Sequence, residues 1–378
     1  MRALFPFRKS SEPARADSGT QICQSLGPDS PKSRRLRITQ AVQYDNYRKA
    51  ITEELSEGFA SREGFLYDLL RYHLGWTDER GQPQDNVMPL HIAPLLALMT
   101  CEALSGDYSP ALPVASAVEL LYNFTLVHGE VQAGRINAQD RPSIWWVWGP
   151  AQAINAGDGL HAMSRAAIIK LSQHDVPPEQ VLKAVESLDR ACLAMCEGQY
   201  LDLSFQDQLM VTSSDYYGMI QRKTGALTRC SAYLGALVTG SDEAECGRFG
   251  EAGSLLGMAW QISQDIHDLW GEHGDGVTPS NILNKKKSLP VIYTLETAST
   301  ATKRELGNIY MKRVLEPEDA TRIVNILEES GAQQLAESKA SELVDQALSI
   351  LTSTALSQDG QQALATFGQE ILTGGFSE

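Results

Sequence analysis

The chain has 378 residues and a formal net charge of −15, with 43% hydrophobic and 21% charged residues. This length allows one large domain or two smaller ones with a substantial core. The acidic balance argues against a protein whose surface binds nucleic acid. No apolar run reaches the roughly 20 residues that a helix needs to cross a bilayer, so we expect no stable membrane insertion. The six cysteines form no Cys-x-x-Cys pair, which favours reduced thiols in a cytoplasmic protein.

The first 38 residues lack apolar periodicity and are rich in Ser, Pro and Arg, so we expect a mobile tail there. From about residue 39 to residue 378, apolar residues recur at helical spacing between Gly- or Pro-marked turns. The longest expected helices cover residues 114–128, 151–171, 178–199, 214–238 and 243–270. No alternating strand pattern persists, which excludes a doubly wound fold. We therefore predict a single all-α domain, a bundle of long helices, over residues 39–378.

An apolar segment over residues 257–272 ends in a cluster of acids. Asp265, Asp268 and Glu272 are spaced i, i+3, i+7, so they share one face of the expected helix. Like charges stacked in this way repel each other unless a cation lies among them. Mg²⁺ that also contacts a phosphorylated substrate fits such oxygen ligands. The alternative is an acidic helix end that is simply solvated.

Several other short sequence motifs occur in a fixed order along the chain, between about residue 45 and about residue 350. They are APLL at 93–96, ELLYNFTLVH at 119–128, RP at 141–142, QAINAGD at 152–158, RKTGAL at 222–227 and KKKSLP at 285–290. Together with the acidic segment, this series resembles the trans-isoprenyl diphosphate synthase (polyprenyl synthetase) family. The resemblance implies a helix bundle around a central cavity, usually in a homodimer. It also implies two Asp-rich motifs that face each other and hold Mg²⁺ on an allylic diphosphate.

The first Asp-rich motif of that family is largely lost. It falls on residues 129–133, where only Glu130 could still bind a metal. The paired arginines that follow it in the family fall on Ala138 and Gln139. Arg141 is the one base left in this segment, and the resemblance makes it a candidate for substrate binding.

The family's site for isopentenyl diphosphate is also changed. Its Gly-Lys-Arg segment falls on residues 89–91, which read Pro-Leu-His, and a later arginine falls on Ala93. A lysine that follows the second motif in the family falls on Gly276 or Val277. Each lost charge-assisted contact is worth about 1.5–3 kcal/mol, so losing two weakens diphosphate binding by about two to four orders of magnitude. We therefore expect no ordinary chain elongation with isopentenyl diphosphate.

The second motif is better kept, and residues 264–272 are similar to the Asn-Asp-x-x-Ser-x-x-x-Glu metal motif of class I terpene synthases. The resemblance gives catalytic roles to Asp265, Asp268 and Lys223, and metal-binding roles to Asp265, Asp268, Glu272 and Glu130. It places the following residues around the substrate: Lys223, Thr224, Gln261, Gln199, Arg141, Phe124, Asn123 and Gln264.

Two hypotheses follow from this pattern of retention and loss. The first is an enzyme that ionises a C15–C20 prenyl diphosphate with Mg²⁺, as a terpene synthase, a cyclase or a non-standard prenyltransferase. The second is a catalytically silent or regulatory subunit that forms a heterodimer with an active synthase. Retention of three acids on one helical face favours the first hypothesis, since a silent subunit has no use for them.

Overall fold

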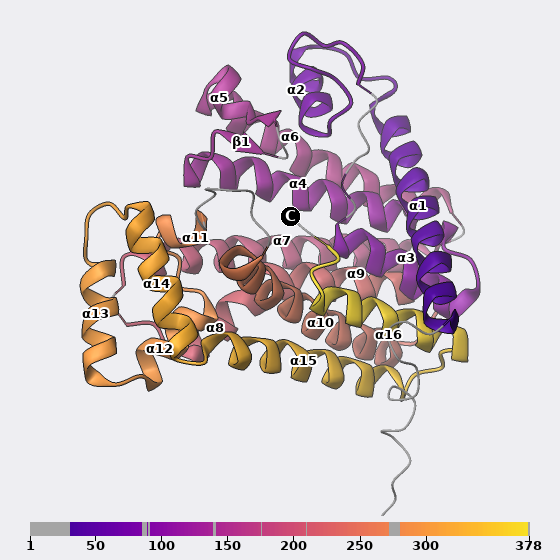
Figure 1. The fold of residues 1–378 in the computed structure, drawn as a ribbon. Coiled ribbons are helices and arrows are strands. Elements are labelled where there is room, and N and C mark those ends of the chain that lie inside the picture. The colour runs from indigo at the N-terminus through magenta and orange to yellow at the C-terminus, as the bar shows by residue number, and fades with distance from the viewer. Residues whose placement is uncertain are drawn as a thin grey trace, which may run out of the picture. The chain divides into compact units, whose positions relative to one another are not determined.

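The computed structural model describes residues 31–84, 89, 91–138, 141–174, 176–208, 210–271 and 280–376. The chain divides into two units, Met1–Asn46 and Tyr47–Glu378, and the second unit contains all the candidate site residues. Long helices dominate it, so the predicted all-α fold is confirmed (Figure 1). The α-helices are α1 (Pro31–Phe59), α2 (Phe65–His73), α3 (Ile92–Ser105), α4 (Leu112–Ala133), α5 (Ile144–Trp148), α6 (Pro150–Ile169), α7 (Pro178–Gln206), α8 (Ser213–Ile220), α9 (Ala226–Leu237), α10 (Glu243–Trp270), α11 (Ser280–Leu283), α12 (Leu289–Thr297), α13 (Thr300–Tyr310), α14 (Pro317–Glu329), α15 (Ala332–Leu351) and α16 (Gln358–Leu372).

Short elements complete the described part of the chain. They are the 3-10 turns η1 (Ser109–Ala111) and η2 (Lys170–Gln173), the π-helical segment η3 (Gln221–Gly225), and the strands β1 (Asn137–Ala138) and β2 (Arg141–Pro142). The two strands pair in an antiparallel ribbon. Helix α1 begins at Pro31, inside the tail predicted for residues 1–38, and residues 1–30 lie outside the described residues.

Helix α9 lies at the centre of the second unit, where it packs against α3, α4, α7 and α10. Helix α10 also packs along α15, and α4 along α6 (Figure 1). A glycine permits the close approach of α9 and α10, because a Cβ at Gly257 would lie 2.0 Å from the Oγ1 atom of Thr228. Many side chains of residues 257–270 are buried in the bundle, among them Met258, Trp260, Ile262 and Leu269.

One helix of the described residues, Ser109–Ala133, is long and apolar enough to cross a membrane by length and composition alone. Two thirds of its most apolar window, 67%, is buried inside the structure. A core helix of a water-soluble bundle passes the same test, and the burial favours that interpretation.

Local sequence signals fix where the site-bearing helices begin and end. Helix α4 ends at Ala133 because Gly134 adopts a left-handed φ of 62°, which leaves Glu130 in the last turn. Helix α10 begins after Asp242, whose carboxylate accepts a hydrogen bond of 2.7 Å from the backbone N–H of Glu245. Its length then carries Asp265 and Asp268 into its last two turns.

The segment predicted as one helix over residues 214–238 is interrupted. A capping box between Thr212 and Asp215 starts α8, and the five residues of η3 then form a π-helical turn before α9 continues. This wide turn carries Lys223 and Thr224. Hydrophobic periodicity cannot reveal such a turn, because α8 and α9 each keep helical spacing on either side of it.

Candidate functional site

A cavity of about 460 Å³ lies among α3, α4, α7, α9, α10 and η3. Its lining includes the aromatic side chains of Phe124, Tyr122 and Trp260. The ionisable and amide side chains that line it include His91, His128, Glu130, Gln132, Arg135, Asn137, Gln199, Asp202, Gln206, Lys223, Gln261, Asn284 and Lys286. Five of the residues predicted around the substrate therefore share one cavity: Lys223, Thr224, Gln261, Gln199 and Phe124.

The lysine of the π turn is paired with an acid that the sequence analysis missed. The Nζ atom of Lys223 lies 2.6 Å from Oδ2 of Asp202, and the Nζ atom of Lys286 lies 3.9 Å from the same oxygen. Burial alone would raise the pKa of Asp202. The two ammonium groups lower the pKa by more than burial raises it, so the pKa of Asp202 is below its ordinary value. Asp202 stands three residues after Gln199 on α7, and that helical spacing could have identified it.

A glycine brings these two elements into contact. A Cβ at Gly198 of α7 would lie only 2.4 Å from the backbone nitrogen of Lys223, so no larger residue fits without displacing η3. The backbone of Lys223 is therefore fixed against α7 one turn from Asp202.

The retained acids of α10 lie next to the cavity. Thr224 Oγ1 donates a hydrogen bond of 2.7 Å to Gln261 Oε1, and Gln261 Nε2 lies 3.4 Å from Asp265 Oδ1. Tyr216 donates its hydroxyl hydrogen to Asp265 Oδ2 at 2.6 Å. Asp265 is 7% exposed, and burial raises its pKa to about 6, although the Tyr216 hydrogen bond lowers it. Asp265 is not one of the cavity-lining residues, so Gln261 links it to the cavity.

The other predicted metal ligands are Asp268, Glu272 and Glu130. Asp268 Oδ2 accepts a hydrogen bond of 3.3 Å from the backbone N–H of Asn281, and Glu272 lies outside the described residues, as do Gly276 and Val277. Glu130 lines the cavity, and burial raises its pKa to about 7. Its Oε2 atom accepts no hydrogen bond from any described residue.

Within the described ranges, no group of three His, Cys, Asp or Glu side chains is close enough to hold a metal ion. Asp265 and Asp268 nevertheless share one face of α10 and offer carboxylate oxygens, which are the donors that Mg²⁺ prefers. These two residues fit part of a Mg²⁺ site whose other ligands would be substrate oxygens and water.

At the position where the resemblance places the isopentenyl site, the structure has a buried, hydrogen-bonded pair of His91 and Glu119. His91 Nδ1 lies 2.8 and 2.9 Å from the two carboxylate oxygens of Glu119, which is 1% exposed. Asn123 donates a hydrogen bond of 2.7 Å to Glu119 Oε1, so its amide serves this pair and does not line the cavity. Ala93 lines the cavity without any charge, and Leu90 lies outside the described residues.

The side chains of two further residues predicted to contact substrate, Arg141 and Gln264, make hydrogen bonds outside the cavity. The guanidinium of Arg141 donates hydrogen bonds to the backbone carbonyls of Tyr72 and His73, at the end of α2, and lies 5.2 Å from the ring centroid of Tyr72. Gln264 Nε2 donates a hydrogen bond of 2.7 Å to the carbonyl of Phe376. Neither residue lines the cavity, and the proposed substrate contacts of both stay predictions. Ala138 and Gln139, where the paired arginines would fall, offer no described side chain.

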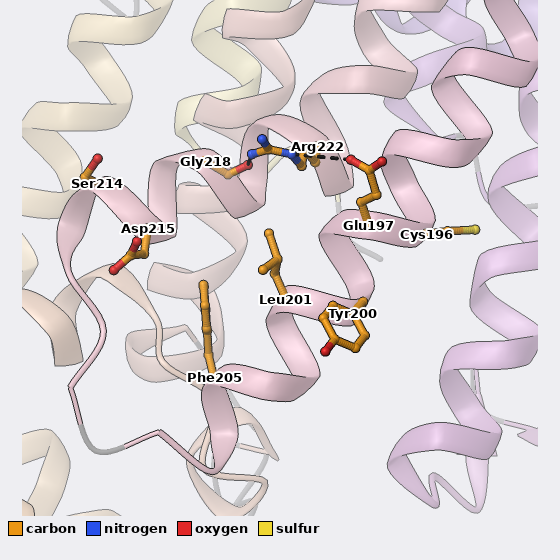
Figure 2. Close-up of a pocket in the computed structure, with 9 residues that line it drawn as sticks. All are labelled: Cys196, Glu197, Tyr200, Leu201, Phe205, Ser214, Asp215, Gly218 and Arg222. Atoms are coloured by element: carbon orange, nitrogen blue, oxygen red, sulfur yellow. Dashed lines mark hydrogen bonds and ion pairs between the residues drawn. The ribbon is translucent and has the colours of Figure 1, made fainter.

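A second hollow, of about 640 Å³, lies between α7 and α8 (Figure 2). Arg222 crosses it, with its Nε atom 3.5 Å from Glu197 and Nη1 donating to the carbonyl of Gly218 at 2.8 Å. Cys196 and Tyr200 line both this hollow and the cavity, so α7 separates the two. None of the predicted catalytic or metal-binding residues lies here.

Comparison with known proteins gives a consistent result. A sequence model described as polyprenyl synthetase matches residues 91–327. The geranylgeranyl diphosphate synthase of Mycobacterium tuberculosis is 33% identical over 274 residues, which are 72% of this chain and 77% of that protein. A polyprenyl synthetase structure from Streptomyces coelicolor superposes with a TM-score of 0.79 at 26% identity, covering 86% of this chain and 98% of that one. The geranylgeranyl pyrophosphate synthetase structure from Geoglobus acetivorans gives 0.73 at 29% identity, covering 87% and 98%.

Proposed function

The chain belongs to the polyprenyl synthetase family, and from that premise we propose that its cavity binds a single prenyl diphosphate and releases the diphosphate in a Mg²⁺-dependent reaction. The proposed substrate has 15–20 carbons. The product is a terpene, or a prenylated acceptor other than isopentenyl diphosphate. The proposed site of action is the cytoplasm.

One observation carries this proposal, namely the uneven distribution of charge around the cavity. Lys223 and Lys286 line it beside Asp202, next to the acids of α10. At the position of the family's isopentenyl site, the cavity instead has Ala93 and a His91 that is held by the buried Glu119. A buried carboxylate repels a second diphosphate, so the charges favour one bound diphosphate and disfavour two.

The residues of the chain suggest how the diphosphate would leave. Lys223 and Lys286 exchange their contacts with Asp202 for charge-assisted hydrogen bonds to the leaving diphosphate. Mg²⁺ held by Asp265 and Asp268 would supply further positive charge that stabilises the departing oxygen. Thr224 and Gln261 orient this end of the cavity through their mutual hydrogen bond.

The aromatic side chains that line the cavity would protect the resulting cation. Phe124, Tyr122 and Trp260 line it, and aromatic faces attract cations by about 0.5–2 kcal/mol. The same side chains keep water away from a reactive centre. The ring centroids of Phe124 and His161 lie 5.4 Å apart. We propose that Phe124 helps to set the chain length of the substrate.

The second candidate is a catalytically silent subunit that pairs with an active synthase. Two observations favour this candidate: the described residues contain no three-acid cluster, and Lys223 is paired with Asp202. Either function is compatible with a dimer. Helices α6 and α7 expose apolar side chains, among them Ile154, Leu193 and Tyr200; Leu193 is 66% exposed and Tyr200 is 71% exposed. We propose that this surface forms the contact of a homodimer or heterodimer.

A product assay separates the two candidates. The purified protein is incubated with Mg²⁺ and C10, C15 or C20 prenyl diphosphates, with and without isopentenyl diphosphate, while pyrophosphate and organic products are measured. Release from a single substrate that disappears in an Asp265→Ala and Asp268→Ala double variant, but not in Asp345→Ala on the exposed face of α15, supports the proposed enzyme. No release at any chain length favours the silent subunit, and an elongated diphosphate contradicts the exclusion of ordinary elongation.

A further inference from the structure

His91 is held in one orientation by Glu119. The two carboxylate oxygens lie 2.8 and 2.9 Å from Nδ1, and Asn123 donates a hydrogen bond of 2.7 Å that fixes the carboxylate. Both members of the pair are buried, at 5% and 1% exposure. A carboxylate accepts hydrogen bonds, so Nδ1 carries a ring hydrogen, and in the neutral form of the ring Nε2 is the nitrogen with the unshared electron pair.

The second nitrogen of His91 has no described hydrogen-bond partner. Its Nε2 atom is buried without one, and the His91 side chain makes no capping hydrogen bond although it precedes α3. Buried polar atoms in folded proteins nearly always have a partner, so an unpaired one calls for an explanation. His91 lines the cavity, where a ligand could supply that partner.

The surroundings of His91 indicate what kind of ligand fits. Ile92, Ala93 and Leu227 line the cavity with it, and the ring of Tyr122 lies 4.5 Å from its ring between centroids. Along α4, Glu119 precedes Glu130 by three turns, or about 16 Å. Arg135, just beyond that end of α4, is close enough to Asp202 to lower its pKa, so the charged cluster lies toward the far end. His91 therefore borders an apolar part of the cavity, and Glu119 lies behind it, outside the cavity lining.

We propose that His91 is the base that accepts a proton from the prenyl cation formed in this cavity, with Glu119 as its positioning and charge-balancing partner. This inference rests on the proposed function, since it requires that a diphosphate has left. It names the group that ends the reaction, and it implies an alkene as the product.

The step balances as a simple proton transfer. The carbon–oxygen bond to diphosphate has already broken, and its electron pair left with the diphosphate. A C–H bond next to the cationic carbon then breaks, its electron pair becomes the new C=C bond, and the proton bonds to Nε2 of His91. The Glu119 carboxylate offsets the positive charge of the imidazolium, and the proton passes to solvent when the alkene leaves.

Product analysis gives the first test. In His91→Phe and in Glu119→Gln, diphosphate release from the prenyl diphosphate should stay within a few-fold of the wild type, while the main alkene falls at least about tenfold in favour of alcohols or other alkenes. Glu119→Gln keeps a hydrogen-bond acceptor but removes the charge, so it separates charge balance from orientation. Thr321→Val, which removes an exposed hydroxyl on α14 that donates to the carbonyl of Pro317 at 3.1 Å, should leave the product unchanged.

A binding measurement tests the pair without turnover. The probe is a prenyl dimethylammonium ion, whose N–H can donate to Nε2 and whose charge mimics the cation, titrated in the presence of Mg²⁺ and inorganic pyrophosphate. Its affinity should fall about tenfold or more in His91→Phe and in Glu119→Gln. If a single variant fails to fold, the double variant His91→Phe/Glu119→Gln removes both partners of the buried pair and keeps the comparison possible.

The outcomes distinguish this inference from the proposed function. Wild-type diphosphate release with unchanged products in the variants overturns the role of His91 and leaves the ionising enzyme in place. No wild-type release overturns the proposed enzyme and the base role of His91 with it, even if ammonium binding depends on His91. Equal ammonium affinity in wild type and variants overturns the inference whether or not diphosphate is released.

Discussion

The hydroxyl of Tyr216 donates a hydrogen bond of 2.6 Å to Oδ2 of Asp265, a carboxyl group that is buried beside the cavity. Burial raises the pKa of Asp265 to about 6 in spite of this hydrogen bond. The folded protein therefore holds the proton of Asp265 more tightly than the unfolded chain does. At neutral pH, the ionised form of this buried carboxyl group, which we propose as a metal ligand, destabilises the folded protein.

The first prediction concerns the free energy of unfolding of Asp265→Asn. Because the folded pKa is raised, the contribution of Asp265 is fully present below about pH 4 and is lost as the pH rises through about 6. The variant should therefore gain up to about 3 kcal/mol relative to the wild type between pH 4 and pH 7, measured by urea unfolding. Asp345→Asn, on the exposed face of α15, should differ from the wild type by less than about 0.5 kcal/mol. An unchanged difference across this pH range would argue against the raised pKa.

The second prediction concerns the contact between α7 and η3. Gly198→Ala should lower the melting temperature by several degrees and abolish pyrophosphate binding, because the new methyl group would collide with the backbone of Lys223. Gly247→Ala is the matched control, since its Cβ would meet nothing within 4 Å in the same kind of helical setting. It should be neutral or stabilising by up to about 1 kcal/mol. Thermal unfolding and calorimetric titration of both variants decide the matter.

The third prediction tests the diphosphate-binding role of Lys223. Lys223→Gln should weaken binding of inorganic pyrophosphate with Mg²⁺ by about 10- to 100-fold, which is the value of one charge-assisted hydrogen bond. Arg222→Gln removes a neighbouring charge that lies in the hollow of Figure 2, and it should change the affinity by less than about threefold. Equal losses in both variants would mean that net charge, and not a specific contact, governs the binding.

The fourth prediction separates two roles for Arg141. Arg141→Lys should destabilise the fold by about 1–3 kcal/mol, because lysine cannot donate to both the Tyr72 and His73 carbonyls in the fork that a guanidinium makes. Pyrophosphate affinity of the folded variant should remain that of the wild type. A large loss of affinity at unchanged stability would instead support the substrate contact that the sequence suggested.

The sequence predicted the helical architecture because apolar spacing survives even where the site residues have changed. It also placed eight residues around the substrate: Lys223, Thr224, Gln261, Gln199 and Phe124 line one cavity, whereas Arg141, Asn123 and Gln264 do not, and substrate binding by any of them stays a prediction. The sequence also suggested that Asp265, Asp268, Glu272 and Glu130 bind metal together. Among the described residues, Asp265, Asp268 and Glu130 do not form one metal-binding group, and Glu272 lies outside the described residues, so the metal-binding role of these acids stays a prediction.

Other features could not be predicted because they depend on contacts between distant segments. Asp202 pairs with Lys223 across 21 positions of the chain, and His91 pairs with Glu119 across 28. A family pattern gives the places where charges have been lost, but not the side chains that now fill those places. Arg141 illustrates the converse, since a base that seemed to remain for substrate is bound to backbone carbonyls at the end of α2.

The π-helical turn at Gln221–Gly225 has a consequence for insertions and deletions. Each residue of an α-helix advances by about 100°, so a π turn shifts the rotational phase of everything that follows it by one residue. Deleting one residue there would restore a regular helix and rotate α8 relative to α9 by about 100°. Since α9 is held by α3, α4, α7 and α10, the rotation would fall on α8 and turn Tyr216 away from Asp265. The orientation of this residue pair is thus set by the number of residues in the turn as well as by their chemistry.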